Sequence, residues 1–370
     1  MAILRGRGVK NYGWGFLLLL VLLLGASQAL AVVVPGQGIP ETVLDREQPQ
    51  VQAVMRTQDR FAPGLMALPG VVGTATGLAA DGRPGILVLV ESLDAVRGAR
   101  VPAALEGIPV MVRVTGKIIP LAKGGVPGSP GVSDSSSDQC SADSTGRFPR
   151  PAPIGVSTGH PAITAGTIGV RVKGAGNVYA LSNNHVYASE NQASLGDSVL
   201  QPGAYDGGTD PGDAIGILVD FEPIVFSTSA SNRMDVAIAL TSTGNLDSST
   251  PCNGYGTPRS TTATAAINQS VKKYGRTTGL TNGRITGIHA TVNVSYKQGT
   301  ARFVDQLIIE PGGFSAGGDS GSLIVVDGKG KNKADDRKPV GLLFAGSSQI
   351  TIASPIDPIL ERFAVTVDGQ

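Results

Sequence analysis

Three short polar motifs in the second half of the chain carry residue types that can break an acyl bond. His185 follows an apolar run, Asp235 precedes another, and Ser320 lies in the glycine-rich run 317–322 ahead of a third. A histidine within hydrogen-bond reach of a serine can remove its hydroxyl proton, and a carboxylate can orient the imidazole for that step. The sequence thus offers a candidate base, orienting acid and nucleophile, in the order His, Asp, Ser.

Each motif alone has an ordinary alternative. A histidine in a loop is commonly a surface residue, an aspartate ahead of a strand commonly belongs to a turn, and Gly-Asp-Ser-Gly runs occur in glycine-rich loops. The combination is more specific, because its order is that of chymotrypsin-like proteases and differs from the orders in subtilisins and α/β-hydrolases.

Short strands separated by turns are expected to position these motifs. From about residue 153 the chain alternates brief β-branched runs with Gly, Pro, Ser and Thr, a pattern typical of sandwiches and barrels. A mostly β fold is therefore predicted for this region. We expect strands at 167–172, 178–181, 214–219, 236–240, 284–288, 303–309, 322–326, 340–344 and 350–353, and a helix at 355–363.

Residues 32–120 are expected to form a small α/β domain without catalytic residues. Val51, Val54 and Met55 have helical spacing. Strands are expected at 70–78, 85–91 and 108–114. Residues 121–152 are rich in Gly, Ser, Pro and Asp and lack an apolar period, so they are interpreted as a flexible linker. The protease-like region then extends over residues 153–368.

The composition excludes several classes of protein. Of the 370 residues, 41% are hydrophobic and 16% are charged, against roughly 25% charged in an ordinary soluble domain. A coiled coil or a charge-driven disordered chain would need many more charged residues. A net charge of +1 gives no basic signature, so no nucleic-acid partner is expected.

Residues 1–31 have the pattern of a secretory signal peptide. Arg5, Arg7 and Lys10 precede the apolar run 16–24, and the run 29–31 reads Ala-Leu-Ala, a small-residue cleavage site. The protein is therefore expected to be exported, to the periplasm or the extracellular space, with no membrane contact after cleavage. An uncleaved N-terminal anchor is the alternative.

Export permits a disulfide between Cys140 and Cys252, the two cysteines of the chain. The bridge would close a loop of about 112 residues and stabilise the fold by roughly 4–5 kcal/mol in the chain-entropy model. Two unpaired thiols are the alternative. Two cysteines and three scattered histidines have no metal-ligand spacing, so no metal is expected.

Residues 153–368 resemble a trypsin-like serine protease of the chymotrypsin-fold, S1-type family. The resemblance is carried by the runs 181–186, 274–281, 317–323 and 340–347. Asn-Asn-His-Val around His185 is similar to Deg-type proteases, although Asp319 stands where those have Asn. Gly-Arg-Thr-Thr-Gly at 275–279 is similar to bacterial lytic endopeptidases. Taken together, the residues of these four runs are most similar to those of the narrow-leaf-type trypsin-like proteases of plants and bacteria.

This resemblance implies a double six-stranded β-barrel preceded by the small α/β domain. It implies a catalytic triad of His185, Asp235 and Ser320. It also implies an oxyanion hole made by the backbone N–H groups of Gly318 and Ser320, where a Cβ at position 318 would hinder the turn.

In the trypsin family a buried cation accompanies the carboxylate at the position of Asp319. No convincing Ile-Val-Gly-Gly start follows a basic residue here, so a new α-amino group is not expected to supply that charge. In bacterial lytic proteases a basic side chain supplies it, and Lys273, or alternatively Arg276, lies at that place. We expect one of them to reach Asp319, with no N-terminal cleavage needed for activity. Two solvated basic residues are the other interpretation.

The family spacing places Phe314 at the base of the substrate pocket, where trypsins have Asp. It places Phe344, Ala345 and Gly346 on the strand that pairs with the substrate backbone. An apolar or small residue is therefore expected before the cleaved bond. A wall residue turned away from the pocket is the alternative for Phe314.

Together these features predict an exported serine endopeptidase that acts through an acyl-enzyme on a protein or peptide, with no metal or organic cofactor. The alternatives are an inactive binding protein on a protease fold, and an esterase or acyl-transfer enzyme with the same triad. The α/β domain is interpreted as a pro-domain, a partner-binding module or an autoinhibitor. The acidic run 206–213 is a cation site or, alternatively, a solvated loop. Surface or structural roles are expected for His160 and His289.

Overall fold

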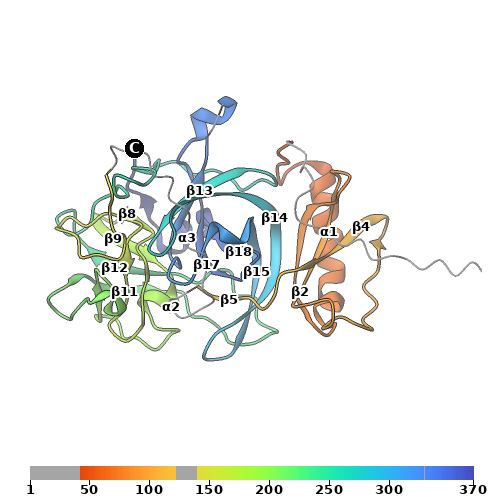
Figure 1. The fold of residues 1–370 in the computed structure, drawn as a ribbon, viewed down its shortest axis with the longest axis horizontal. Coiled ribbons are helices and arrows are strands. Elements are labelled where there is room, and N and C mark those ends of the chain that lie inside the picture. The colour runs from red at the N-terminus through yellow and green to blue at the C-terminus, as the bar shows by residue number, and fades with distance from the viewer. Residues whose placement is uncertain (1–41, 122–139, 329) are drawn as a thin grey trace, which may run out of the picture.

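The protein is described here by a computed structural model that covers residues 42–121, 140–328 and 330–370. The predicted signal peptide and most of the predicted linker lie outside these residues. Strands dominate the described residues, which confirms the predicted mostly β class (Figure 1). No helix within the described ranges is long and apolar enough to cross a bilayer.

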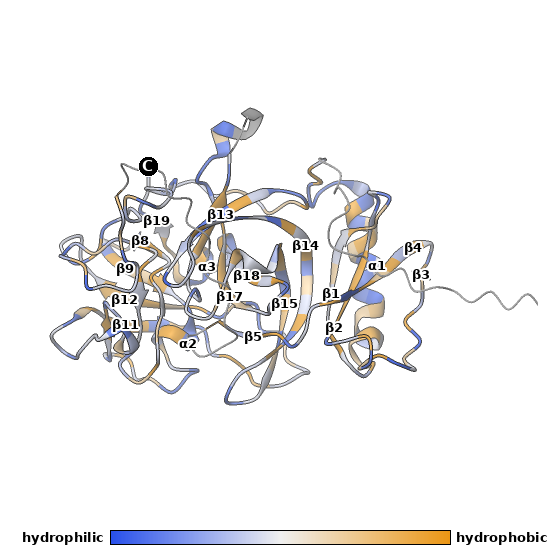
Figure 2. Ribbon diagram, in the orientation of Figure 1, coloured by the Kyte–Doolittle hydropathy of each residue, from blue (hydrophilic) through white to orange (hydrophobic). Residues whose placement is uncertain are grey.

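The N-terminal unit, residues 42–114, is a helix packed on a small sheet. Strand β1 pairs antiparallel with β2, which pairs parallel with β4. Apolar residues of α1 are buried against this sheet, and Figure 2 shows hydrophobic and hydrophilic residues alternating along the helix. Its elements are α1 (Pro49–Met66), β1 (Val71–Leu78), β2 (Pro84–Val90), β3 (Ala104–Leu105) and β4 (Ile108–Val114).

A ring of six paired strands forms the centre of the molecule. Each strand is hydrogen-bonded to the next in the order β13-β16-β17-β18-β15-β14, and β14 pairs back to β13. The long β14 extends beyond the ring and pairs with β1, so the N-terminal unit continues the same sheet (Figure 1). The strands are β13 (Ser270–Gly275), β14 (Gly279–Ser295), β15 (Thr300–Glu310), β16 (Leu323–Val326), β17 (Pro339–Gly346) and β18 (Thr351–Pro355).

A second sheet packs beside this ring, with the strand order β10-β11-β12-β9-β8-β19. Its strands are β8 (Val170–Gly174), β9 (Asn177–Ser182), β10 (Ser198–Leu200), β11 (Ala214–Phe221), β12 (Ala237–Thr241) and β19 (Thr366–Val367). The remaining elements are β5 (Ile119–Pro120), β6 (Ser157–Thr158), β7 (Gly166–Thr167), α2 (Asn184–Tyr187), α3 (Ile356–Phe363), and the 3₁₀ helices η1 (Ala204–Asp206), η2 (Gly312–Phe314) and η3 (Gly330–Asp335).

One hydrophobic cluster joins the two sheets and brings the polar motifs together. Leu181 of β9 and Val236, which directly precedes β12, pack in it with Leu323 and Leu342 from the ring. Burying a side chain of this size stabilises a fold by roughly 1.5–3 kcal/mol. Since His185, Asp235 and Ser320 each lie within four residues of a member of the cluster, all three reach the boundary between the sheets.

Of the nine strands expected after residue 153, eight are present with shifted ends, and the run 167–172 is divided between β7 and β8. The predicted C-terminal helix is α3, and the short β10 was not expected. Strand β13 was not expected, because its two lysines interrupt the apolar alternation. Val271 and Lys273 are both fully buried. Because a charged residue occupies a core position, the apolar alternation that would predict the strand from the sequence is interrupted.

Candidate active site

His185 and Asp235 are brought together by adjacent strands. His185 lies on α2 directly after β9, and Asp235 lies just before β12, which pairs with β9 so that Ser182 faces Ala237. The Nδ1 atom of His185 lies 2.6 Å from Oδ2 of Asp235, and both side chains are buried. The His185 backbone N–H also donates to Asp235 Oδ1 over 3.2 Å. A carboxylate at Nδ1 fixes the proton there and leaves Nε2 as the acceptor.

A third group, Tyr296, binds the same carboxylate. Its hydroxyl donates to Asp235 Oδ2 over 2.7 Å, and its ring meets that of His185 edge-on at 6.1 Å between centroids. Burial, and then the charge of Asp235, raise the pKa of Tyr296 well above its usual value, so the hydroxyl keeps its proton. Sequence reasoning missed Tyr296 because a single tyrosine beyond a strand belongs to no motif.

Ser320 sits on a turn that requires glycine on both sides. Gly318 and Gly321 have φ of +107° and +95°, and a Cβ at Gly318 would lie 2.3 Å from Thr277 Oγ1. The Ser320 hydroxyl donates to the carbonyl of Phe344 over 3.2 Å. Nε2 of His185 is buried and has no hydrogen-bond partner among the residues that the structure describes.

The backbone N–H groups of Gly318 and Ser320 point at one carbonyl oxygen, that of Leu121. The N···O distances are 2.5 Å for Gly318 and 3.4 Å for Ser320. Two convergent amide donors beside a serine can stabilise negative charge on an oxygen bonded to the carbon that the serine attacks. Leu121 was expected at the start of a flexible linker, and no local signal in the sequence could have placed it here.

Asp319 is held by four hydrogen bonds and one cation. Its carboxylate accepts from the backbone N–H groups of Thr277, Thr278 and Ala316 and from the Thr278 hydroxyl. Lys273 Nζ lies 3.4 Å from Asp319 Oδ2, with both side chains completely buried. Burial lowers the pKa of Lys273, and the charge of Asp319 opposes that shift.

Arg276, the alternative partner proposed for Asp319, forms an ion pair with Asp206 instead. Its Nε donates to Asp206 Oδ2 over 2.8 Å. Asp206 also accepts from the Ser157 hydroxyl over 2.5 Å. Asp213, at the other end of the acidic run, binds Arg147 at 2.6 Å. The expectation of a solvated loop was therefore wrong for these two carboxylates, which are paired with arginines and nearly buried.

The predicted pocket residues lie around the Ser320 turn. Phe314 is 1% exposed on η2, with its ring centroid 5.9 Å from Lys273 Nζ, and its carbonyl accepts from the Thr281 hydroxyl. Ala345 and Gly346 on β17 pair with Pro120 and Ile119 of β5. The strand expected to pair with a substrate is thus paired with another part of this chain.

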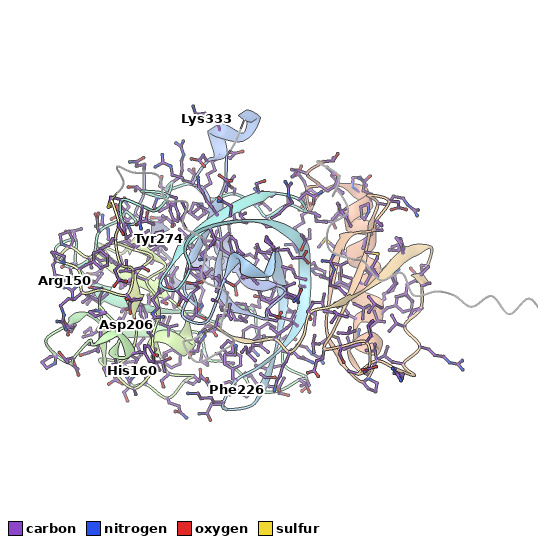
Figure 3. All side chains as sticks on the ribbon, in the orientation of Figure 1. Arg150, His160, Asp206, Phe226, Tyr274 and Lys333 are labelled. Carbon is purple, nitrogen blue, oxygen red and sulfur yellow. A yellow bond between two sulfur atoms is a disulfide. The ribbon has the colours of Figure 1, made fainter. Side chains whose placement is uncertain are left out.

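The remaining predicted residues lie outside this constellation. Cys140 and Cys252 form the expected disulfide, with their Cα atoms 5.9 Å apart. His160 lies 3.0 Å from Asp197, and Figure 3 shows it, like Asp206, on the side of the molecule away from the N-terminal unit. His289 lies 2.7 Å from Asp59 and 3.1 Å from Asp305. No group of three potential metal ligands occurs within the described ranges.

Residues 259–356 match the family model of the Nal1 C-terminal domain. This match confirms, over that part of the chain, the resemblance to narrow-leaf-type proteases. The matched stretch includes Lys273, Asp319 and Ser320, whereas His185 and Asp235 lie ahead of it. No curated protein matches the chain.

Several solved protease structures are similar to part of the chain. A glutamic acid specific serine protease is 21% identical and covers 58% of this chain and 100% of its own, with a TM-score of 0.41. Protease A of Thermobifida fusca is 18% identical, with coverages of 59% and 100% and a TM-score of 0.41. Nocardiopsis protease is 21% identical, with coverages of 58% and 99% and a TM-score of 0.40. Because these values are low, we base the function on the geometry of the site.

Proposed function

We propose that the chain is a serine endopeptidase that cleaves peptide bonds through an acyl-enzyme. The observation that carries the proposal is the pair of N–H groups, from Gly318 and Ser320, that meet at one carbonyl oxygen beside the Ser320 hydroxyl. The buried His185–Asp235 pair supports it further, since Nε2 of His185 has no hydrogen-bond partner in the part of the chain that the structure describes. Lone His–Asp pairs are common, but a backbone donor pair at a serine serves acyl chemistry in particular.

In the proposed reaction the Ser320 hydroxyl turns from the Phe344 carbonyl to Nε2 of His185 and attacks the substrate carbonyl carbon. His185 takes the hydroxyl proton, and the amides of Gly318 and Ser320 hold the oxyanion. His185 then gives that proton to the leaving amine as the C–N bond breaks. Water, deprotonated by His185, hydrolyses the acyl-enzyme and restores Ser320. Asp235 stabilises the imidazolium throughout.

Lys273 is proposed to hold the Ser320 turn through Asp319, so the oxyanion donors need no new α-amino group. The double six-stranded barrel and the boundaries at residues 120 and 153 belong to the same proposal, since the ring of strands and the second sheet each supply part of the triad. The disulfide supports export, because such bonds persist in oxidising compartments. Phe314 at the pocket supports an apolar residue before the cut.

A fluorophosphonate probe, read by peptide mass spectrometry, tests the proposal. Labelling is measured on the wild-type chain and on Leu121→Asp, because the Leu121 carbonyl occupies the amide pair. We expect a label on Ser320, lost in Ser320→Ala and reduced by about 10⁴-fold in rate in His185→Ala. Absence of label from both the wild type and Leu121→Asp would refute the proposed enzymatic activity.

A further inference from the structure

Residues 118–121 run along the proposed substrate strand in the manner of a bound peptide. Ile119 pairs antiparallel with Gly346, and the Leu121 N–H donates to the Phe344 carbonyl over 3.2 Å. Extended peptides bind proteins in this way, by adding a strand whose backbone gives affinity and whose side chains give specificity. This pairing brings the Leu121 carbonyl to the Gly318 and Ser320 amides, where a reacting carbonyl belongs.

The side chains of this segment are also seated like those of a substrate. Leu121 is 2% exposed and packs in the cluster that contains Phe314. A Cβ on Gly346 would lie 3.1 Å from Leu121 Cδ1, so the strand borders the leucine side chain closely. Ile118 is fully buried in the cluster that contains Phe344. An apolar pocket is therefore filled by Leu121, as the proposed specificity requires.

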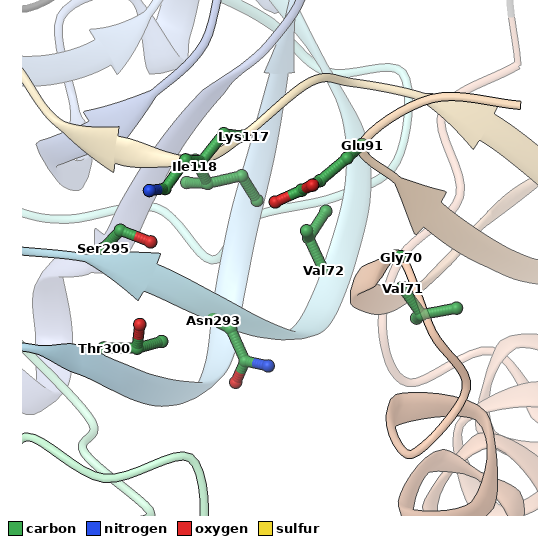
Figure 4. A pocket seen from close by; sticks show the side chains of 9 residues that line it. All are labelled: Gly70, Val71, Val72, Glu91, Lys117, Ile118, Asn293, Ser295 and Thr300. Atoms are coloured by element: carbon green, nitrogen blue, oxygen red, sulfur yellow. The ribbon is translucent and has the colours of Figure 1, made fainter. Parts of the chain in front are cut away.

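The segment reaches the site from the N-terminal unit across a cavity. Lys117 and Ile118 line a cavity of about 200 Å³, whose lining side chains are drawn in Figure 4. Val72 and Glu91 of the N-terminal unit line it, as does Ser295 of β14. The Ser295 N–H donates to the Ile118 carbonyl over 3.0 Å, which marks where the segment joins the ring of strands. Upstream of that bond Lys117 is exposed, and downstream the chain is held as a strand.

We propose that Ser320 cleaves its own chain after Leu121, with residues 118–121 as the substrate; this rests on the function proposed above. Ser320 Oγ bonds to the Leu121 carbonyl carbon, and His185 takes its proton. The Leu121–Ala122 bond breaks, and the proton passes to the amine of Ala122. Water then hydrolyses the ester, leaving a carboxylate on Leu121 and a free Ser320. The same segment indicates the substrate class, namely peptides with the sequence Ile-Ile-Pro-Leu directly before the cleaved bond.

The cut alone would not clear the site. Arg113 binds Glu310 of β15 at 2.5 Å, and β1 pairs with β14, so the N-terminal unit stays attached after cleavage. No covalent link remains, because Cys140 and Cys252 both follow the cut. The Leu121 carboxylate would remain at the two amides as a product inhibitor. This proposal departs from the expectation that no N-terminal cleavage is needed for activity: the Ser320 turn is already formed, but access to it would require the cut and the departure of the segment.

The test is N-terminal sequencing and intact mass of the purified full chain. We expect a fragment that begins at Ala122 from the wild type and none from Ser320→Ala. In Leu121→Asp, a carboxylate in the apolar pocket should slow cleavage by about 100-fold. Leu93→Asp is the matched control, because this half-exposed leucine lies in the N-terminal unit away from the site. Ile119→Pro, which removes one N–H of the strand pairing, should also slow cleavage. This variant tests the proposal if Leu121→Asp does not fold.

The outcomes separate the two proposals. A wild-type chain that is intact at this bond while Ser320 of Leu121→Asp takes the fluorophosphonate label overturns self-cleavage and leaves the enzyme standing. A cut that persists in Ser320→Ala, or that is equally fast in Ile119→Pro, also overturns self-cleavage. A chain that is neither cut nor labelled overturns both.

Discussion

The hydroxyl of Tyr296 donates to the oxygen of Asp235 that also lies 2.6 Å from His185 Nδ1. Tyr296 lies at the end of the hairpin between β14 and β15, so the long hairpin reaches back to the pair on the second sheet. A carboxylate fixed by two donors holds the imidazole more rigidly than one fixed by the histidine alone. We therefore assign Tyr296 as a positioning residue.

In the Leu121→Asp background, in which the site is open, Tyr296→Phe is expected to lower kcat by about tenfold for a peptide with leucine before the cleaved bond, with KM little changed. A hydrogen bond to a charged group is worth about 1.5–3 kcal/mol, and part of that is regained by water. Tyr179→Phe is the matched control, as this partly buried tyrosine lies on β9 away from Asp235. An unchanged kcat, or a rise in KM alone, would refute the assignment.

Gly318→Ala is expected to reduce kcat by about 10²–10³-fold, the effect of losing one oxyanion donor. The new Cβ would meet Thr277 Oγ1 at 2.3 Å and force the peptide away from its present position. Gly98→Ala is the control, because Gly98 also has a positive φ but a Cβ there meets nothing within 4 Å. Both variants carry the backbone strain, so only the first should lose activity, measured by steady-state hydrolysis.

Lys273→Met is expected to lower the free energy of unfolding by about 3–5 kcal/mol, because it leaves the Asp319 charge buried without its cation. The double variant Lys273→Met/Asp319→Asn should recover much of that loss. Lys173→Met, at an exposed lysine paired with Asp368, should change stability by at most about 1 kcal/mol. Urea unfolding measures all three, and equal effects at both lysines would contradict the buried pair.

The attachment of the N-terminal unit is expected to weaken as pH rises above 6.5. His289 bridges Asp59 of α1 at 2.7 Å and Asp305 of β15 at 3.1 Å, and Arg46 and Arg233 also face Asp305. Burial lowers the pKa of His289, but the bonds to Asp305 and Asp59 outweigh it, so the pKa is raised above 6.5. Its contribution is complete below that value and is lost as pH rises through the folded pKa.

The lower limit of the pH range in which the N-terminal unit is held firmly is set by Asp305. Burial raises its pKa, but hydrogen bonds from His289 and Arg46 lower it below 3.8 overall, so its contribution is lost only in stronger acid. The protection factors of the α1 amides, which correct their exchange rates for the intrinsic pH dependence of amide exchange, should therefore be highest between about pH 4 and 6.5. His289→Gln should flatten the profile and His160→Gln should not. The lowest protection factors at pH 5 in the wild type would contradict this.

Local patterns predicted most of the strands and the three motifs, because both depend on neighbours in sequence. The apolar runs ahead of His185 and after Ser320 are buried strands whatever they pair with. Leu121 could not be predicted, since its place depends on β17, more than two hundred residues later. The composition around it is that of a linker. The role of Tyr296 could not be predicted for the same reason, because its partner Asp235 lies beside the second sheet.

The alternatives left open by the sequence were decided by packing. Lys273 and Arg276 are equivalent in the motif, yet β13 turns the first inward toward Asp319 and leaves the second beside η1 and Asp206. Burial of a lysine is costly, so no composition rule would assign it to the core. The partner of the buried Lys273 is determined only by the tertiary fold, which places the turn that carries Asp319 next to it.

Strand β14 pairs with neighbouring strands along both of its edges, so the N-terminal unit covers an edge that the ring leaves open. Along residues 287–292 its outer backbone is hydrogen-bonded to β1 and its inner side belongs to the ring. Departure of the N-terminal unit would strip those amides and carbonyls of their partners and uncover Ile288 and Val292, both now buried. An unprotected edge strand of this kind recruits other chains. The N-terminal unit thus caps this edge, and its departure is expected to favour association of the remaining chain through β14 unless another segment covers it.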